Sequence, residues 1–132
     1  MRSLLLDTHV LYWLWSGSVD RLSASALSAI ESADELLVAA ITWYELALLL
    51  ERGRIELVET TAPAALASMA DRVTTALLTW PIAVRAAGLE RSPEFPRDPA
   101  DRLIFATASE RGVRLVTGDG RLRRFSSEIC LW

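Results

Sequence analysis

The stretch SLLLDTHVLYWL, residues 3–14, decides the fold of this chain of 132 residues. Its first part is a short, unbroken apolar run, which is typical of a strand that is buried on both faces of a parallel sheet. The run ends abruptly on Asp7, and Thr8 and His9 follow directly. A carboxylate here has no structural role beyond starting the next helix. Asp7 is therefore the first candidate for a functional residue.

The composition predicts one globular domain, residues 1–132. The chain is 52% hydrophobic and 23% charged, and its length suits a single core. Every apolar run is interrupted well before the roughly 20 residues that a membrane span needs, and no basic leader precedes Asp7. We therefore expect a cytoplasmic protein without a membrane segment. Cys130 is the only cysteine, which excludes an intrachain disulfide and a thiolate metal cluster.

Apolar runs alternate with helical patterns along the chain. Strands are predicted at residues 4–7, 35–42, 74–80 and 113–119, with a candidate last strand at 128–132. Helices are predicted between them, at residues 25–33, 43–53, 64–73, 82–89 and 100–112. Ser23 and Thr42 are expected to cap the first two of these helices. The alternation favours the α/β class, with a central, mainly parallel sheet in a three-layer α/β/α sandwich.

Five acidic residues fall where ligands bind in such folds, outside the carboxyl ends of the strands. Asp7 ends the first strand, and Asp119 ends the fourth. Glu45 lies in the first turn of the helix after the second strand, whereas Asp98 and Asp101 open the helix that leads to the fourth. All of these positions belong to one edge of the sheet. We therefore expect the carboxylates to converge.

Converging carboxylates repel one another and are costly to desolvate unless a cation compensates them. Mg²⁺ and Mn²⁺ take oxygen ligands and leave positions open for water and phosphate. Such a site can activate water and neutralise charge during phosphodiester hydrolysis. Every basic side chain of the sequence is an arginine. Those beside the acids are candidate contacts to nucleic-acid phosphates; they are Arg97, Arg102, Arg121, Arg123 and Arg124.

Each acid except Asp7 also has a structural interpretation. Thr42 and Glu45 have the spacing of a capping box. Asp98 and Asp101 suit the first turn of a helix that begins with proline, and Asp119 suits a turn. The arginines that follow Asp119 equally suit an exposed, solvated face. One residue at a time, these patterns are weak, and only their shared position at one edge of the sheet favours a site.

His9 and three tryptophans favour packing roles. The chain has no second histidine and no cysteine near His9, so a nitrogen-based metal site is not expected. His9 is expected to orient a metal ligand or to pack, and contact of Thr8 or His9 with substrate is left open. Trp13, Trp15 and Trp43 lie near helix starts among apolar neighbours, which favours core or subunit contacts over base stacking.

Four segments in this order resemble the PIN-domain family, and within it the VapC toxins of bacterial type II toxin and antitoxin pairs: LLLDTHVLYWL, AAITWYELALL, DPADRLIFATA and LVTGD. The resemblance covers nearly the whole chain. It implies a compact α/β/α fold, an Mg²⁺- or Mn²⁺-dependent endoribonuclease, a homodimer and a small VapB-like antitoxin. It assigns catalytic and metal-binding roles to Asp7, Glu45, Asp101 and Asp119, with Asp98 as a further metal ligand ranked below Asp101.

Two other functions stay open at this point. Haloacid-dehalogenase phosphatases and response-regulator receivers are similar to this chain in one respect, because they also place an aspartate, which accepts the phosphoryl group, at the end of the first strand. Both families use a lysine near the phosphoryl group, and this chain contains none, which makes an aspartate-based phosphatase a poor match. The other alternative is a PIN-like domain that binds RNA or a protein without cleaving it.

Overall fold

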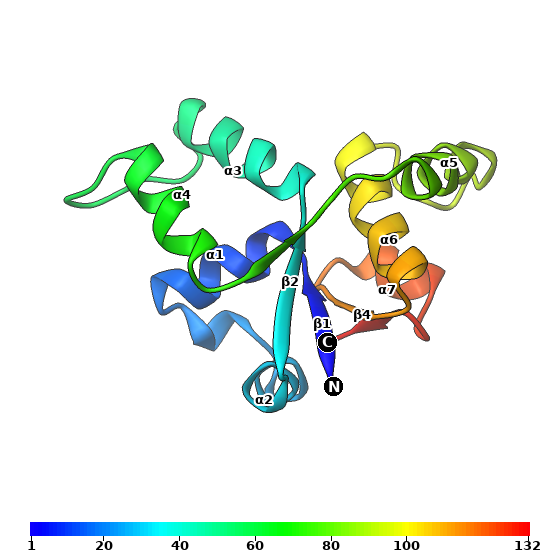
Figure 1. Ribbon diagram of the computed structural model, residues 1–132, viewed down its shortest axis with the longest axis horizontal. Helices are drawn as coiled ribbons and strands as arrows, with labels where there is room; N and C mark the ends of the chain where they lie inside the picture. Colours follow the sequence, from blue (N-terminus) through cyan, green and yellow to red (C-terminus); the bar gives the residue numbers. More distant parts are fainter.

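The computed structural model describes residues 1–132, and its centre is a five-stranded sheet (Figure 1). The strands are β1 (Ser3–Leu6), β2 (Glu35–Ala39), β3 (Thr74–Ala76), β4 (Arg114–Val116) and β5 (Cys130–Leu131). Their order is β3-β2-β1-β4-β5, and each neighbouring pair is parallel. The predicted α/β class with a parallel sheet is confirmed.

Helices connect the strands and cover both faces of the sheet. They are α1 (Thr8–Ser16), α2 (Ala24–Ser32), α3 (Ile41–Glu51), α4 (Ala62–Ala70), α5 (Trp80–Gly88), α6 (Pro99–Arg111) and α7 (Gly120–Phe125), with short 3-10 turns η1 (Val19–Arg21) and η2 (Leu89–Arg91). In Figure 1, α1, α2 and α4 lie on one side of β1 and β2, and α5, α6 and α7 lie on the other. No helix combines the length and the apolar character that a bilayer span requires.

Strand β1 contributes to both halves of the core, because successive side chains of a strand point to opposite faces. Leu4 and Leu6 pack into the cluster that includes residues of α1, α2 and α4. Leu5 packs into the cluster on the α6 side. All three side chains are at most 4% exposed. Burial on both faces is the reason for the unbroken apolar run, and the end of this run places Asp7 at the carboxyl edge.

The loop before α6 is held in place by an aromatic cluster. Phe95 is 2% exposed, and its ring meets Phe105 of α6 at 5.1 Å and Phe125 of α7 at 4.9 Å between centroids, both edge to face. Such pairs add to the free energy of burial. The cluster therefore anchors the start of α6, which carries Asp98 and Asp101, next to α7.

The predicted cap of the helix after β2 is wrong. β2 ends at Ala39, and α3 already begins at Ile41, so Thr42 lies inside the helix. No side chain caps α3, and the capping box of Thr42 and Glu45 does not form. Glu45 lies in the second turn of α3 instead of the first. The apolar run continues without interruption from strand to helix, so the local pattern contains no signal for the boundary.

Other element ends also differ from the prediction. β3 ends at Ala76 and β4 at Val116, which makes both strands shorter than the apolar runs that predicted them. Asp119 is the N-cap of α7, a helix that the sequence analysis did not predict. Ser23 and Asp98 cap α2 and α6 as expected. Leu77 and Leu78, which extend the apolar run beyond β3, lie in the loop before α5, and Trp80 begins that helix.

Candidate active site

A cleft of about 420 Å³ lies at the carboxyl edge of the sheet. Its lining includes all five acidic residues that the sequence analysis singled out, which are Asp7, Glu45, Asp98, Asp101 and Asp119. Three of them cap helices α1, α6 and α7, and the other two lie in α3 and in the first turn of α6. The parallel sheet thus brings carboxylates from four separate parts of the chain into one hollow.

Asp7 is held from two sides. Its Oδ1 accepts a hydrogen bond from the backbone N–H of Thr8 at 2.8 Å, and its Oδ2 accepts one from the Thr117 hydroxyl at 2.6 Å. The Asp7 backbone N–H donates to the Val116 carbonyl at 3.0 Å, which extends the pairing of β1 and β4. Burial raises the pKa of Asp7 above its ordinary value, although both hydrogen bonds oppose this rise.

Glu45 reaches the same cleft from α3. Its carboxylate accepts a hydrogen bond from the Thr8 hydroxyl, and the Thr42 hydroxyl oxygen lies 3.1 Å from that of Thr8. Thr8 and Thr42 are both buried. Burial raises the pKa of Glu45, the Thr8 hydrogen bond lowers it, and repulsion from Asp7 adds to the rise. Thr8 therefore connects two acids, one through its backbone and one through its side chain.

Asp101 is repelled by all four of the other carboxylates in the cleft. Burial first, and then repulsion from the four other carboxylates, raises its pKa to about 7. Asp98 and Asp119 are stabilised differently, because their Oδ1 atoms accept backbone N–H groups of Ala100 at 3.0 Å and Arg121 at 2.8 Å. Negative charge at a helix N-terminus is favourable. Ionisation of Asp101 is thus unfavourable without a compensating cation.

The structure places Arg102 away from the acids. Its guanidinium forms an ion pair with Glu90 and donates to the Pro96 carbonyl at 3.1 Å, so it fastens the loop that precedes α6. Arg97 lines the hollow beside this ion pair and not the acidic cleft. The predicted phosphate contact of Arg102 would require breaking this arrangement.

The arginines of α7 are exposed to solvent. Arg121 approaches Asp119 at 3.4 Å with 59% of its side chain exposed, which makes this a weak surface pair. Arg123 and Arg124 are also exposed. No arginine is among the residues that line the cleft. The cleft therefore contains five acidic side chains, and the arginines lie outside it.

The sequence analysis missed two contributors to the cleft. Thr117 is fully buried and orients Asp7, and Trp132 lines the cleft beside Gly118. Thr117 stands in the segment LVTGD, two residues before Asp119, but its partner is 110 residues away. Trp132 follows β5, and only the order of the strands reveals that β5 ends at the acidic edge. No local pattern signals either role.

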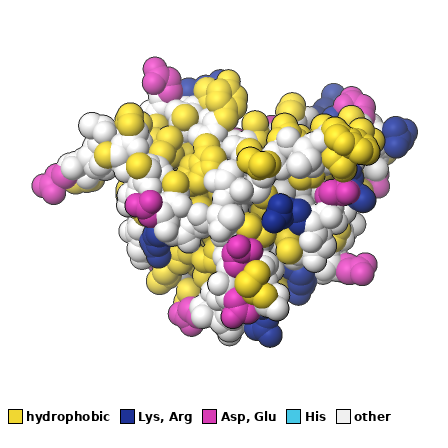
Figure 2. Space-filling view, viewed as in Figure 1, with side chains coloured by type: hydrophobic (Ala, Val, Ile, Leu, Met, Phe, Trp, Pro, Cys, Tyr) yellow, Lys and Arg dark blue, Asp and Glu magenta, His cyan; other side chains and the backbone are white.

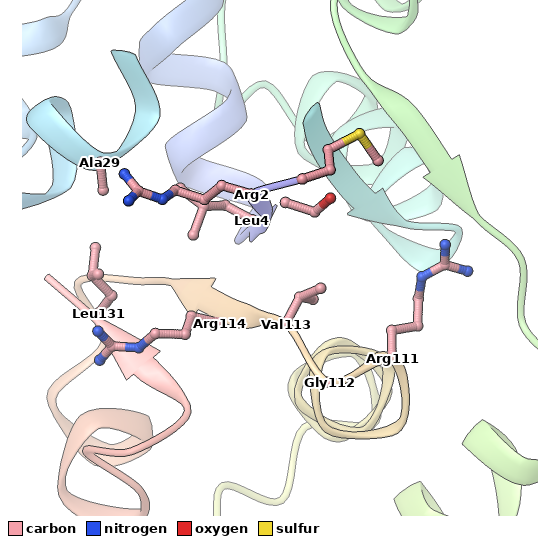
Figure 3. Close-up of a pocket in the computed structure, with 10 residues that line it drawn as sticks. Arg2, Leu4, Ala29, Arg111, Gly112, Val113, Arg114 and Leu131 are labelled. Atoms are coloured by element: carbon pink, nitrogen blue, oxygen red, sulfur yellow. The ribbon is translucent and has the colours of Figure 1, made fainter. Parts of the chain in front are cut away.

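A larger hollow, of about 610 Å³, lies at the amino-terminal ends of the strands (Figure 3). Figure 3 shows that Arg2 and Arg114 extend to one side of it and Arg111 to the other, so their charges do not converge. The Arg114 guanidinium is already used, because it donates to the Cys130 carbonyl at 2.6 Å. No carboxylate lines this hollow, and it offers neither a metal site nor a formed anion site.

Fold and cleft together define a parallel α/β domain with an acidic site at the carboxyl edge of its sheet. The chain belongs to the PIN-domain family, because the sequence model of the PIN domain matches residues 4–128. Ribonuclease VapC22 of Mycobacterium tuberculosis (strain ATCC 25618 / H37Rv) is 50% identical to the chain over 134 residues, and the alignment covers 100% of both proteins.

Two solved structures share the fold of this chain. VapBC2 from Rickettsia felis, bound to a DNA fragment from its promoter, matches with a TM-score of 0.74 and 16% identity, covering 98% of this chain and 97% of that one. A toxin-antitoxin complex from Klebsiella pneumoniae matches with a TM-score of 0.69 and 20% identity, covering 98% and 96%. At such identities the likeness demonstrates the fold alone.

Proposed function

We propose that this chain is a metal-dependent endoribonuclease and the toxin of a type II toxin-antitoxin pair. The observation that carries the proposal is the convergence of five carboxylates in one cleft, three of them with a raised pKa. The relative with 50% identity over the full length is named a ribonuclease, which supports RNA as the substrate. PIN-domain ribonucleases generally use a divalent metal.

The donor set suits Mg²⁺, with Mn²⁺ as a substitute, because it offers only oxygen ligands with excess negative charge. Asp7, Glu45, Asp101 and Asp119 would hold the ion, and Asp98 would complete the set. No three acidic, histidine or cysteine side chains are already arranged to hold an ion, so binding would draw the carboxylates together. A bound divalent ion supplies Lewis acidity that activates water and neutralises phosphate charge.

The residues of the chain have distinct parts in this proposal. Asp7 is oriented by two hydrogen bonds and is the fixed point of the set. Glu45 is aimed by Thr8. Asp101 has a pKa of about 7 in the metal-free cleft, so it holds a proton part of the time near neutral pH and must release it to bind a cation. His9 is exposed and lines the cleft. The chain has no second histidine that could bind a metal ion together with it.

The direct test is metal-dependent cleavage of RNA. The purified chain with Mg²⁺ or Mn²⁺ is expected to cut a generic single-stranded RNA, and excess EDTA is expected to abolish the cut, because the carboxylates alone cannot activate water. Products are resolved on a denaturing gel and their ends are sequenced. Cleavage that persists in excess EDTA would contradict the proposal. Binding without cleavage at any metal concentration would favour the non-catalytic alternative.

The hydroxyl of Thr117 is expected to matter for activity. Thr117→Val keeps the shape of the buried side chain and removes the donor to Asp7, so cleavage should fall about 10- to 100-fold, as for other groups that orient a metal ligand. Thr107→Val is the matched control, because Thr107 is also buried but donates to the Leu103 carbonyl inside α6. Equal cleavage activity of the two variants would show that the Thr117 hydroxyl does not contribute to activity.

Partners follow from the same family membership. We propose a small VapB-like antitoxin as inhibitor, a homodimer in solution and a cytoplasmic location. The antitoxin is supported by the structural neighbours that are complexes of a toxin with its antitoxin. An exposed apolar patch near the start of α5 supports the homodimer, since hydrophobic side chains gather there in Figure 2. The patch is formed by Leu77, Leu78, Trp80 and Val84, each more than half exposed.

A further inference from the structure

We propose that the indole of Trp132 is a base-binding surface, on which a nucleobase of the RNA next to the cut phosphodiester bond stacks. This inference rests on the proposed ribonuclease function and names a contact that positions the RNA in the cleft. Trp132 lines the cleft together with Asp7, Asp101 and Asp119. The Trp132 side chain is half-buried, and its indole lies against Gly118, another residue that lines the cleft.

Electrostatics alone cannot hold RNA in this cleft. The lining contains five acids, one histidine and no arginine, and the chain has a formal charge of -3. A bound cation compensates the acids locally, but it contacts the phosphate and not the base. Stacking of a neutral base on an aromatic ring does not depend on charge and tolerates any base. Trp132 and Trp13 are the only tryptophans among the lining residues.

The surroundings of Trp132 fix its ring in place before any ligand arrives. The indole lies against Gly118, where a Cβ would come within 3.0 Å of its Cζ2 atom. On another side the ring meets Trp13 of α1, with 6.4 Å between centroids and 56° between planes. Gly118 also separates Thr117, which orients Asp7, from Asp119. An aromatic ring that is already ordered loses little entropy when a base stacks on it.

Trp13 has the supporting role in this arrangement. It packs into the cluster on the α1 side of the sheet, as the sequence analysis expected, and the Arg21 guanidinium lies 5.8 Å from its ring centroid. His9 contacts the same ring at 5.8 Å between centroids. The aromatic wall of the cleft thus runs from His9 through Trp13 to Trp132. The last of these rings lies nearest to the segment that contains Asp119.

The test combines an abasic substrate series with variants of Trp132. In an RNA whose cut site has been mapped, each nucleotide within about three of the cut is replaced in turn by an abasic analogue, a span that matches the reach of one stacked base. One abasic position is expected to lower kcat/KM of the wild-type chain about 5- to 100-fold. Trp132→Leu should lower kcat/KM on intact RNA by a similar factor, and its kcat/KM should no longer respond to that abasic position. Trp132→Phe should recover part of the lost kcat/KM, because phenylalanine keeps an aromatic ring.

Trp15→Leu is the matched control, because Trp15 is a half-buried tryptophan of α1 that does not line the cleft. It should keep the abasic sensitivity of the wild type. Gly118→Ala is a second variant, which displaces the indole without changing it and should act in the same direction as Trp132→Leu. If Trp132→Leu and wild type respond equally to every abasic position, or if no position is sensitive, the proposal is wrong.

A binding measurement separates this proposal from the proposed function. Tryptophan emission of the metal-free Asp7→Asn chain is titrated with a short single-stranded RNA and with an abasic chain of equal length. The RNA should quench the emission and the abasic chain should not, and the quenching should vanish with Trp132→Phe but persist with Trp15→Phe. Quenching without any cleavage by the wild type would overturn the nuclease and keep the base-binding surface. Cleavage by the wild type, with no quenching that is lost in Trp132→Phe, would keep the nuclease and overturn the base-binding surface.

Discussion

Asp7→Asn is expected to lower metal-dependent RNA cleavage by about 100-fold or more, because it removes the charge that compensates the cation while it keeps the shape of the side chain. The amide oxygen of Asn can still accept the backbone N–H of Thr8. Burial disfavours the ionised form of Asp7, so its neutral replacement should not destabilise the fold. Activity and stability should therefore separate in this variant.

The measurement is single-turnover cleavage at saturating metal, together with a thermal melt in EDTA. Asp71→Asn is a suitable control, because Asp71 is an exposed residue at the C-terminus of α4. It should keep wild-type activity. Full activity of Asp7→Asn would remove Asp7 from the reaction, and an unfolded Asp7→Asn chain would show that its charge is needed for the fold.

Asp101→Asn is expected to have opposite effects on activity and on metal-free stability. The pKa of Asp101 rises from 3.8 in the unfolded chain to about 7 in the folded one, so between these values the folded state binds more protons. Stability in EDTA should then fall as pH rises through this window and level off above about pH 7. Burial of Asp7 and Glu45 adds to the same trend, because their pKa values are raised too.

Asp101→Asn should remove most of this pH-dependent loss of stability, because the substituted side chain is neutral at every pH in the window. At pH 8 in EDTA, Asp101→Asn should be more stable than the wild type by on the order of 1–4 kcal/mol, while its cleavage activity is lost. Added Mg²⁺ or Mn²⁺ should raise the melting temperature of the wild type and have little effect on the variant. Urea unfolding between pH 4.5 and 8 checks the slope. A flat wild-type profile, or an equal slope in both chains, would show that the cleft is not strained by its charges.

The positions of the acids could be predicted from the sequence because each lies next to a recognisable element. Asp7 ends an apolar run, and Asp98 begins a helix with proline behind it. The topology of an alternating α/β chain then assigns both to the same edge of the sheet. The spacing of Thr42 and Glu45 misled the prediction, since it also matches a capping box. The helix begins two residues earlier than that motif requires, and both side chains instead face the buried Thr8 hydroxyl.

The contacts around the acids were decided by the tertiary structure. Arg102 lies beside Asp101 in the sequence, yet its guanidinium pairs with Glu90, because side chains adjacent on a helix point in different directions. Thr117 orients Asp7 across 110 residues, and Trp132 reaches the cleft only because β5 pairs in parallel with β4. Such contacts depend on strand order and register, and no local pattern encodes these.

The sequence by itself determined the α/β class, the burial of the first strand and the edge at which the acids gather, because these follow from the spacing of apolar and acidic residues along the chain. The tertiary structure decided which hydroxyls orient the carboxylates, which arginines stay outside the cleft and which tryptophans line it. The physical reason is that hydrogen bonds and packing act over a few ångströms in space, and only the assembled sheet brings distant parts of the chain within that range.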